Sequence, residues 1–152
     1  MTESRLEPIV ILLVEDNPAD ARLTAEGLKR AKVLNRLHVV EDGVAALDFL
    51  YRRPPHQNAP RPDLILLDLN LPKMDGRQVL VEIKHDPALA HIPVVILTTS
   101  EADRDVLAAY EMHASCYVVK PVGLNEFVTI VKSIENFWLA IVTLPPTIER
   151  RS

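Results

Sequence analysis

Acidic residues follow two apolar runs of the chain, at the point where each run ends. The run Ile9–Val14 leads directly into Glu15 and Asp16, and the run Leu64–Leu67 leads into Asp68. If these runs are neighbouring parallel strands, three carboxylates meet at one edge of a sheet. Their like charges repel one another unless a divalent cation lies among them. The pattern therefore predicts a small cation site built from carboxylate oxygens.

The elements that must position these acids follow a regular alternation. Continuous runs rich in Val, Ile and Leu are typical of strands buried on both faces. Five such runs occur, at Ile9–Val14, Leu37–Val40, Leu64–Leu67, Val94–Leu97 and Cys116–Val119. Segments of helical period lie between and after them: one starts at Asn17-Pro18, one covers 44–50, and others run near 77–84, near 101–112 and from 124 to 141. The Asn-Pro start is a typical helix cap followed by proline in the first turn.

This alternation predicts a doubly wound α/β fold with a five-stranded parallel sheet and helices on both faces. In the flavodoxin-like strand order 2-1-3-4-5, the first and third strands are neighbours at the point where ligands bind such sheets. The fourth run ends in Thr98 and the fifth in Lys120-Pro121. We therefore expect a hydroxyl and an ammonium at the same edge as the acids.

Taken together, these residues resemble a response-regulator receiver domain, the phosphate-accepting half of a two-component pair. The similarity extends from about Pro8 to Ile141. Its motifs are the pair Glu15 and Asp16, then Asp68 with Asn70, Pro72 and Gly76 after it, then Thr98, and finally Lys120-Pro121. Each motif alone is weak evidence, but their shared order and spacing are specific.

The resemblance implies a Mg2+-dependent transfer of a phosphoryl group from a histidine kinase to Asp68. A small hard cation prefers oxygen ligands, and we expect Asp16 and Asp68 to bind it directly and Glu15 to act through a water molecule. The family implies the backbone carbonyl of Asn70 as a further ligand. Lys120 is expected to pair with the phosphoryl group as a compact charge.

A signalling route also follows from the resemblance. The Thr98 hydroxyl is expected to move toward the phosphoryl group, and Tyr117, at the family's aromatic switch position, to turn inward behind it. This change would reshape the face formed by the fourth helix, fifth strand and fifth helix as a population shift between two packings.

Structural readings of the same residues stay open at this stage. The pair Glu15 and Asp16 is also what a solvated loop or a helix cap looks like. Asn70 also suits a turn, and Tyr117 also suits a hydrophobic core. The five histidines, at 38, 56, 85, 91 and 113, show no metal-ligand spacing.

Three other functions are weighed against the receiver. A phosphohydrolase of the haloacid-dehalogenase type also uses a strand-terminal Asp with Mg2+, but its general acid and base lies two residues on, where this chain has Asn70. A flavin-binding flavodoxin relative would need a Gly-rich phosphate cradle, and the chain has only 4 Gly. The acids and Lys120 argue against an interaction domain that is not phosphorylated.

Two segments depart from a minimal receiver. A basic, proline-rich insert spans 52–62 and predicts an irregular, stiff surface loop. With other features it resembles the stand-alone regulators of bacterial and cyanobacterial phytochrome kinases, which implies a bacteriophytochrome-type histidine kinase as partner. The last helix carries an apolar set too wide for one face, so we expect a homodimer through Phe137, Trp138, Ile141 and Leu144.

Length and composition set the remaining expectations. The 152 residues, 48% apolar and 25% charged, suit one globular receiver domain over 1–142 with a tail over 143–152 and no output domain. A net charge of −4 disfavours nucleic acid and anionic membranes. A single Cys116 cannot form an internal disulfide, which fits a reducing cytoplasm. No apolar run is long enough to cross a bilayer.

Overall fold

The described part of the chain contains five strands and four helices in regular alternation. The computed structural model describes residues 8–32, 34–99, 104 and 114–133, so the helix expected near 101–112 and the four expected dimer residues, Phe137, Trp138, Ile141 and Leu144, lie outside or almost wholly outside it. The elements are β1 Ile9–Val14, α1 Pro18–Arg30, β2 Asn35–Val40, α2 Gly43–Leu50, β3 Leu64–Asp68, α3 Gly76–His85, β4 Val94–Thr98, β5 Cys116–Val119 and α5 Leu124–Ser133.

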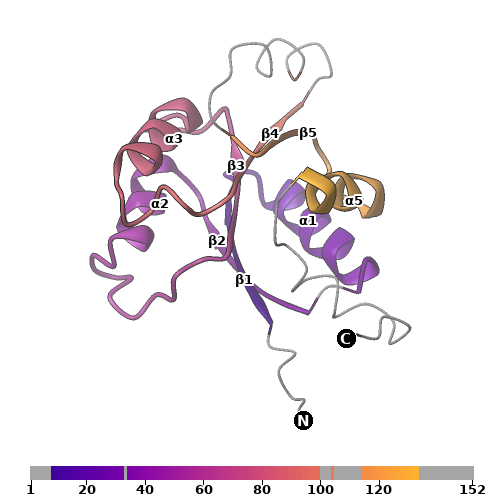
Figure 1. Ribbon diagram of the computed structural model, residues 1–152, viewed down its shortest axis with the longest axis horizontal. Coiled ribbons are helices and arrows are strands. Elements are labelled where there is room, and N and C mark those ends of the chain that lie inside the picture. The colour runs from indigo at the N-terminus through magenta and orange to yellow at the C-terminus, as the bar shows by residue number, and fades with distance from the viewer. Residues whose placement is uncertain (1–7, 33, 100–103, 105–113, 134–152) are drawn as a thin grey trace.

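The strands form one parallel sheet in the order β2-β1-β3-β4-β5. Figure 1 shows α2 and α3 on one face of this sheet and α1 and α5 on the other. Each face has its own hydrophobic cluster, because successive side chains of the central strands point to opposite faces: Ile11 and Leu13 face α1 and α5, while Leu12 and Val14 face α2 and α3. The predicted fold class and strand order are confirmed.

Helix α1 begins as the sequence predicts, and it packs closely against the loop that follows β5. The Asn17 side chain accepts hydrogen bonds from the backbone N–H groups of Ala19 at 2.9 Å and Asp20 at 3.2 Å. A Cβ atom at Gly27 would lie 2.0 Å from the carbonyl oxygen of Val122. Only glycine permits this approach, so α1 is held directly against the loop that follows Lys120.

Strand β2 differs from expectation in its burial. The run Leu37–Val40 was predicted to be buried on both faces, but β2 is the edge strand next to β1, and Val39 is 45% exposed. The prediction of full burial is wrong for β2, because an apolar run does not reveal whether a strand lies at the edge of the sheet. Side chains of an edge strand have neighbouring side chains on one side only and are covered less. The strand also begins two residues earlier, at Asn35.

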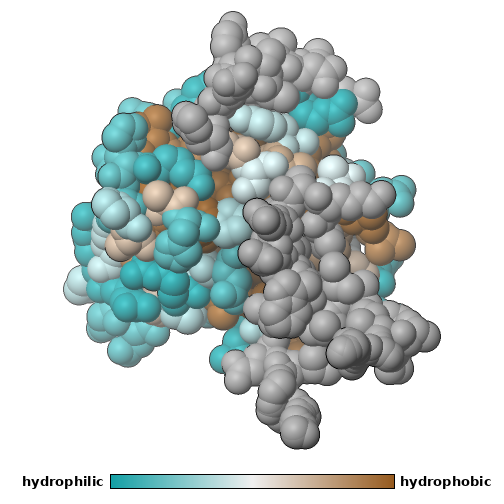
Figure 2. Space-filling view, viewed as in Figure 1, coloured by the Kyte–Doolittle hydropathy of each residue, from teal (hydrophilic) through white to brown (hydrophobic). Residues whose placement is uncertain are grey.

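The proline-rich insert between α2 and β3 forms turns joined by irregular backbone, as predicted, and it is hydrogen-bonded to the rest of the domain. Arg52 donates from Nε to the carbonyl oxygen of Ala59 at 2.8 Å, and Arg61 donates to the carbonyl oxygen of Leu50 at 3.1 Å. The His56 ring lies 5.5 Å from the Phe49 ring of α2. Figure 2 shows a mainly hydrophilic surface over this side of the molecule.

Cys116 is buried and unpaired, as the sequence indicates. None of the helices in the described segments is both long and apolar enough to cross a bilayer.

Candidate functional site

The carboxyl ends of four strands meet at one edge of the sheet and carry the predicted polar residues. Val14 pairs with Leu67, so Glu15 and Asp68 follow equivalent positions of β1 and β3. At the next strands, the backbone N–H of Lys120 donates to the carbonyl oxygen of Thr98 at 2.7 Å. Parallel pairing alone therefore gathers residues that are far apart in the sequence.

Three carboxylates form a compact cluster at this edge. Glu15, Asp16 and Asp68 each offer an oxygen, and these oxygens lie within 4.8 Å of one another. Glu15 is 2% exposed and Asp68 is 3% exposed, while Asp16 is exposed to solvent. A set of closely spaced carboxylate oxygens, open on one side, fits a hard divalent cation that keeps part of its water shell.

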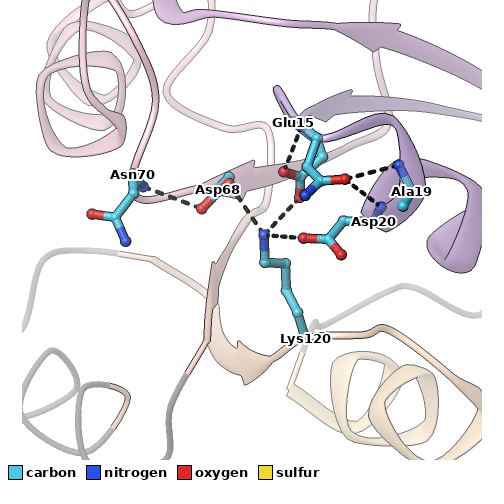
Figure 3. A network of polar contacts seen from close by, with 7 residues as sticks. Glu15, Ala19, Asp20, Asp68, Asn70 and Lys120 are labelled. Carbon is cyan, nitrogen blue, oxygen red and sulfur yellow. Dashed lines mark hydrogen bonds and ion pairs between the residues drawn. The ribbon is translucent and has the colours of Figure 1, made fainter.

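The Lys120 ammonium lies against the cluster and contacts three carboxylates (Figure 3). Its Nζ is 2.9 Å from Glu15 Oε1, 2.9 Å from Asp20 Oδ2 and 3.2 Å from Asp68 Oδ2. The lysine side chain is only 8% exposed. An ammonium group has three N–H donors, so every one of them has a carboxylate partner.

This arrangement changes the proton affinity of both partners. Burial raises the pKa of Glu15 to about 7; the hydrogen bond from Lys120 opposes this rise, and the negative charge of Asp68 adds to it. Burial by itself would lower the pKa of Lys120. The hydrogen bonds to Glu15 and Asp20 and the negative charges of Asp68 and Glu15 outweigh burial, so the net effect raises the pKa of Lys120. The lysine therefore remains charged at neutral pH.

The backbone around Asp68 holds its carboxylate in place. The N–H of Asn70 donates to Asp68 Oδ1 at 3.1 Å, so both carboxylate oxygens have a donor. A Cβ atom at Gly76 would lie 2.5 Å from the backbone carbonyl oxygen of Asp68, which explains the glycine at the start of α3. Asn70 itself is exposed.

The two predicted switch residues lie on neighbouring strands. Thr98 closes β4, is 2% exposed and pairs with Val119 of β5. Tyr117 is half-buried and packs against the hydrophobic cluster on the α2 and α3 face. Their positions are compatible with the expected roles, which stay predictions.

One residue of this network was missed by sequence reasoning, namely Asp20. It is the third residue of α1, one turn after the Asn17 cap, and its side chain reaches Lys120 across the site. A signal was available in principle, since an acid in the first turn of a helix that starts at the end of β1 must lie near the other strand ends. Without the contact to Lys120, however, it looks like an ordinary first-turn acid.

Comparison with known proteins agrees with the fold and this edge of the sheet. Residues 11–132 match the family model of the response regulator receiver domain. The chain belongs to this family of phosphate-accepting signalling domains. It is 52% identical over 145 residues to response regulator Rcp1 of Synechocystis sp., covering 95% of this chain and 99% of Rcp1.

Two solved structures are similar over nearly their whole length. The Mn2+-bound form of Rcp1 has 54% sequence identity and a TM-score of 0.70, covering 91% of this chain and 99% of that chain. The phosphorylated cyanobacterial phytochrome response regulator RcpA has 50% identity and a TM-score of 0.70, with the same coverage. The comparisons support phosphoacceptor signalling and give no support to a haloacid-dehalogenase phosphohydrolase.

Proposed function

We propose that this receiver accepts a phosphoryl group from a histidine kinase on the side chain of Asp68. The observation that carries the proposal is the placement of this carboxylate. Asp68 is 3% exposed, lies in a cluster of three acids, and is 3.2 Å from the ammonium of Lys120. A single nucleophilic carboxylate between a candidate cation site and a fixed positive charge suits phosphoryl transfer.

The chemistry follows from the side chains around Asp68. A carboxylate oxygen attacks the phosphorus of a phosphohistidine; the new O–P bond forms as the N–P bond breaks, and the electron pair returns to the imidazole nitrogen. The Lys120 ammonium shifts from the carboxylate to one phosphoryl oxygen, and the Thr98 hydroxyl donates a hydrogen bond to another. The chain contributes positioning and charge, and catalyses only its own phosphorylation and dephosphorylation.

Asp16, Asp68 and the backbone carbonyl of Asn70 are the proposed direct ligands of Mg2+, and Glu15 is proposed to act on it through a bound water. The oxygen-only donor set and the 4.8 Å cluster support this assignment, as does the Mn2+-bound form of the relative Rcp1. When bound, a divalent cation neutralises negative charge that builds up on the phosphoryl oxygens.

We further propose that the kinase is of the bacteriophytochrome type and that the pair works in the cytoplasm. Support for the kinase comes from the similarity to RcpA, which is described as a phytochrome response regulator. The unpaired, buried Cys116 fits a reducing compartment. The output would be a population shift of Thr98 and Tyr117 that alters the face around β5 and α5, or onward transfer of the phosphoryl group.

Intact mass spectrometry after incubation with Mg2+ and acetyl phosphate tests the site of phosphorylation. One phosphoryl group should be added, and alkali should release it. The variant Asp68→Asn should gain none. The control variant Asp48→Asn, which changes an acid of α2 that pairs with Arg53, should behave like the wild type. An equal adduct on Asp68→Asn would show that the acceptor has been placed wrongly.

Transfer rates from purified histidine kinases test the partner. A bacteriophytochrome-type kinase should transfer its phosphoryl group faster than unrelated kinases at equal concentration. Equal rates across the panel would remove the proposed pairing while leaving the assignment of Asp68 intact.

A further inference from the structure

The three carboxylates that hold Lys120 come from three different parts of the fold. Glu15 follows β1, Asp68 ends β3, and Asp20 lies in the first turn of α1. Figure 3 shows these side chains converging on the ammonium, with Asp20 approaching from the helix. The contacts to Glu15 and Asp20 are equally short, at 2.9 Å each.

These partners differ in what else they can bind. Glu15 and Asp68 belong, with Asp16, to the group of acids whose oxygens lie within 4.8 Å of one another, and Asp20 does not belong to that group. A cation in the group therefore competes with Lys120 for Glu15 and Asp68. It does not compete for Asp20.

We propose that Asp20 is a positioning residue that keeps the Lys120 ammonium paired and in place when a divalent cation engages Glu15 and Asp68, before the phosphoryl group arrives. This inference rests on the proposed function and assigns a part of it to a residue outside the acid cluster. Asp20 touches neither the cation nor the reacting atoms. It acts through Lys120.

The need for such a partner follows from burial. The Lys120 side chain is 8% exposed, so an ammonium that lost its carboxylates would be largely removed from water with no opposite charge beside it, which is strongly unfavourable. Asp20 is better hydrated, with 32% of its side chain exposed, and it is available as a lasting partner.

Helix α1 restricts the position of Asp20. Its backbone N–H is bound by the Asn17 cap at 3.2 Å, and α1 packs against the loop after Lys120 through Gly27, where a Cβ would lie 2.0 Å from the carbonyl oxygen of Val122. The carboxylate and the lysine are therefore carried by two segments that cannot easily separate.

Calorimetric measurement of Mg2+ affinity in the unphosphorylated protein tests the proposal. In Asp20→Asn, binding of Mg2+ should leave the ammonium without a charged partner, and the affinity should fall by about fivefold, since a charge-assisted bond is lost at a partly exposed site. The matched control is Glu41→Gln, which removes an exposed acid lining the same surface pocket as Glu15 and Asp16. This substitution should change the affinity by less than about twofold, because water and ions screen the field of an exposed charge.

The same comparison in a Lys120→Met background separates positioning from simple charge. Without the ammonium, Asp20→Asn should weaken Mg2+ binding no more than Glu41→Gln does. A fivefold loss that persists without Lys120 would overturn the proposal, because Asp20 would then act on the cation itself. Equal effects of Asp20→Asn and Glu41→Gln in the wild-type background would overturn it as well.

A spectroscopic measurement keeps the proposal testable without any cation. In the metal-free protein, 15N-detected hydrogen exchange of the Lys120 Nζ protons should be faster in Asp20→Asn than in Glu41→Gln, with far-ultraviolet circular dichroism unchanged in both. Unchanged exchange would overturn the proposal, because Asp20 would then not hold the ammonium. None of these measurements uses a phosphodonor, so their failure is distinguishable from failure of the phosphorylation of Asp68.

Discussion

Replacing Lys120 by methionine is the most informative single change to the site. Methionine keeps much of the apolar stem of lysine but leaves Glu15, Asp20 and Asp68 without their common cation. The three carboxylates lie 2.9–3.2 Å from the ammonium in the wild type. We expect the metal-free variant to fold, to be much less stable than the wild type, and to gain more from Mg2+.

The size of the loss can be worked out from these contacts. Two unit charges about 3 Å apart attract by about 5 kcal/mol at an effective dielectric constant of about 20, and desolvation of the ammonium offsets part of this. Removing one partner of a buried pair typically destabilises by about 3–5 kcal/mol. For a domain of this size, that loss lowers the melting temperature by roughly 6–20 °C.

The loss should depend on pH with a definite sign. Burial raises the pKa of Glu15 to about 7 from an ordinary 4.5, even though the hydrogen bond from Lys120 lowers it; without that bond the pKa rises further. The folded state then holds this proton more tightly than the unfolded state, so stability increases as the pH falls through the folded pKa toward 4.5. The variant should therefore lose less stability at pH 6 than at pH 8.

Thermal unfolding in chelator and in saturating Mg2+, at pH 6 and pH 8, measures the loss of stability, its dependence on pH and the gain from Mg2+. Mg2+ at one hundred times its Kd should add about 2.7 kcal/mol, and at a fixed concentration it should add more in Lys120→Met, where no ammonium competes for Glu15 and Asp68. The control is Lys73→Met, which breaks an ion pair with Asp42 at 3.5 Å in which the lysine side chain is 67% exposed, and should change stability by less than about 1 kcal/mol. The reasoning is refuted if Lys120→Met matches this control in chelator at pH 8.

Three further changes test other parts of the argument. Gly27→Ala should destabilise by about 3 kcal/mol in urea unfolding, because its Cβ would lie 2.0 Å from the carbonyl oxygen of Val122; a loss no larger than that of the neighbouring Glu26→Ala would argue against this close packing. Asn17→Ala removes the cap that accepts two backbone N–H bonds of α1 and should cost about 1 kcal/mol in the same assay, and an unchanged midpoint would count against the cap. Sedimentation should show a dimer for the wild type at micromolar concentration and a monomer for Trp138→Ala, and a monomer for both would remove the proposed homodimer.

The local elements could be predicted from the sequence because their signals are local. Apolar runs marked all five strands, and Asn17 with Pro18 marked the start of α1. The acids Glu15, Asp16 and Asp68 could be placed together because parallel strands bring their carboxyl ends to one edge of a sheet. Their meeting requires only that β1 and β3 be neighbours, as they are in this sheet.

Only the tertiary structure decided which polar groups touch and how strongly water is excluded from them. The sequence shows Asp20 as an acid in a first helical turn, and its contact with Lys120 exists because packing of α1 brings together residues one hundred positions apart. Exposure of Val39 on β2 was likewise undetermined, since it depends on whether another strand lies alongside. Residue types and order are enough to specify elements and strand ends, but burial and charge pairing are properties of the whole packed fold, and these raise the pKa of Glu15 and keep Lys120 charged.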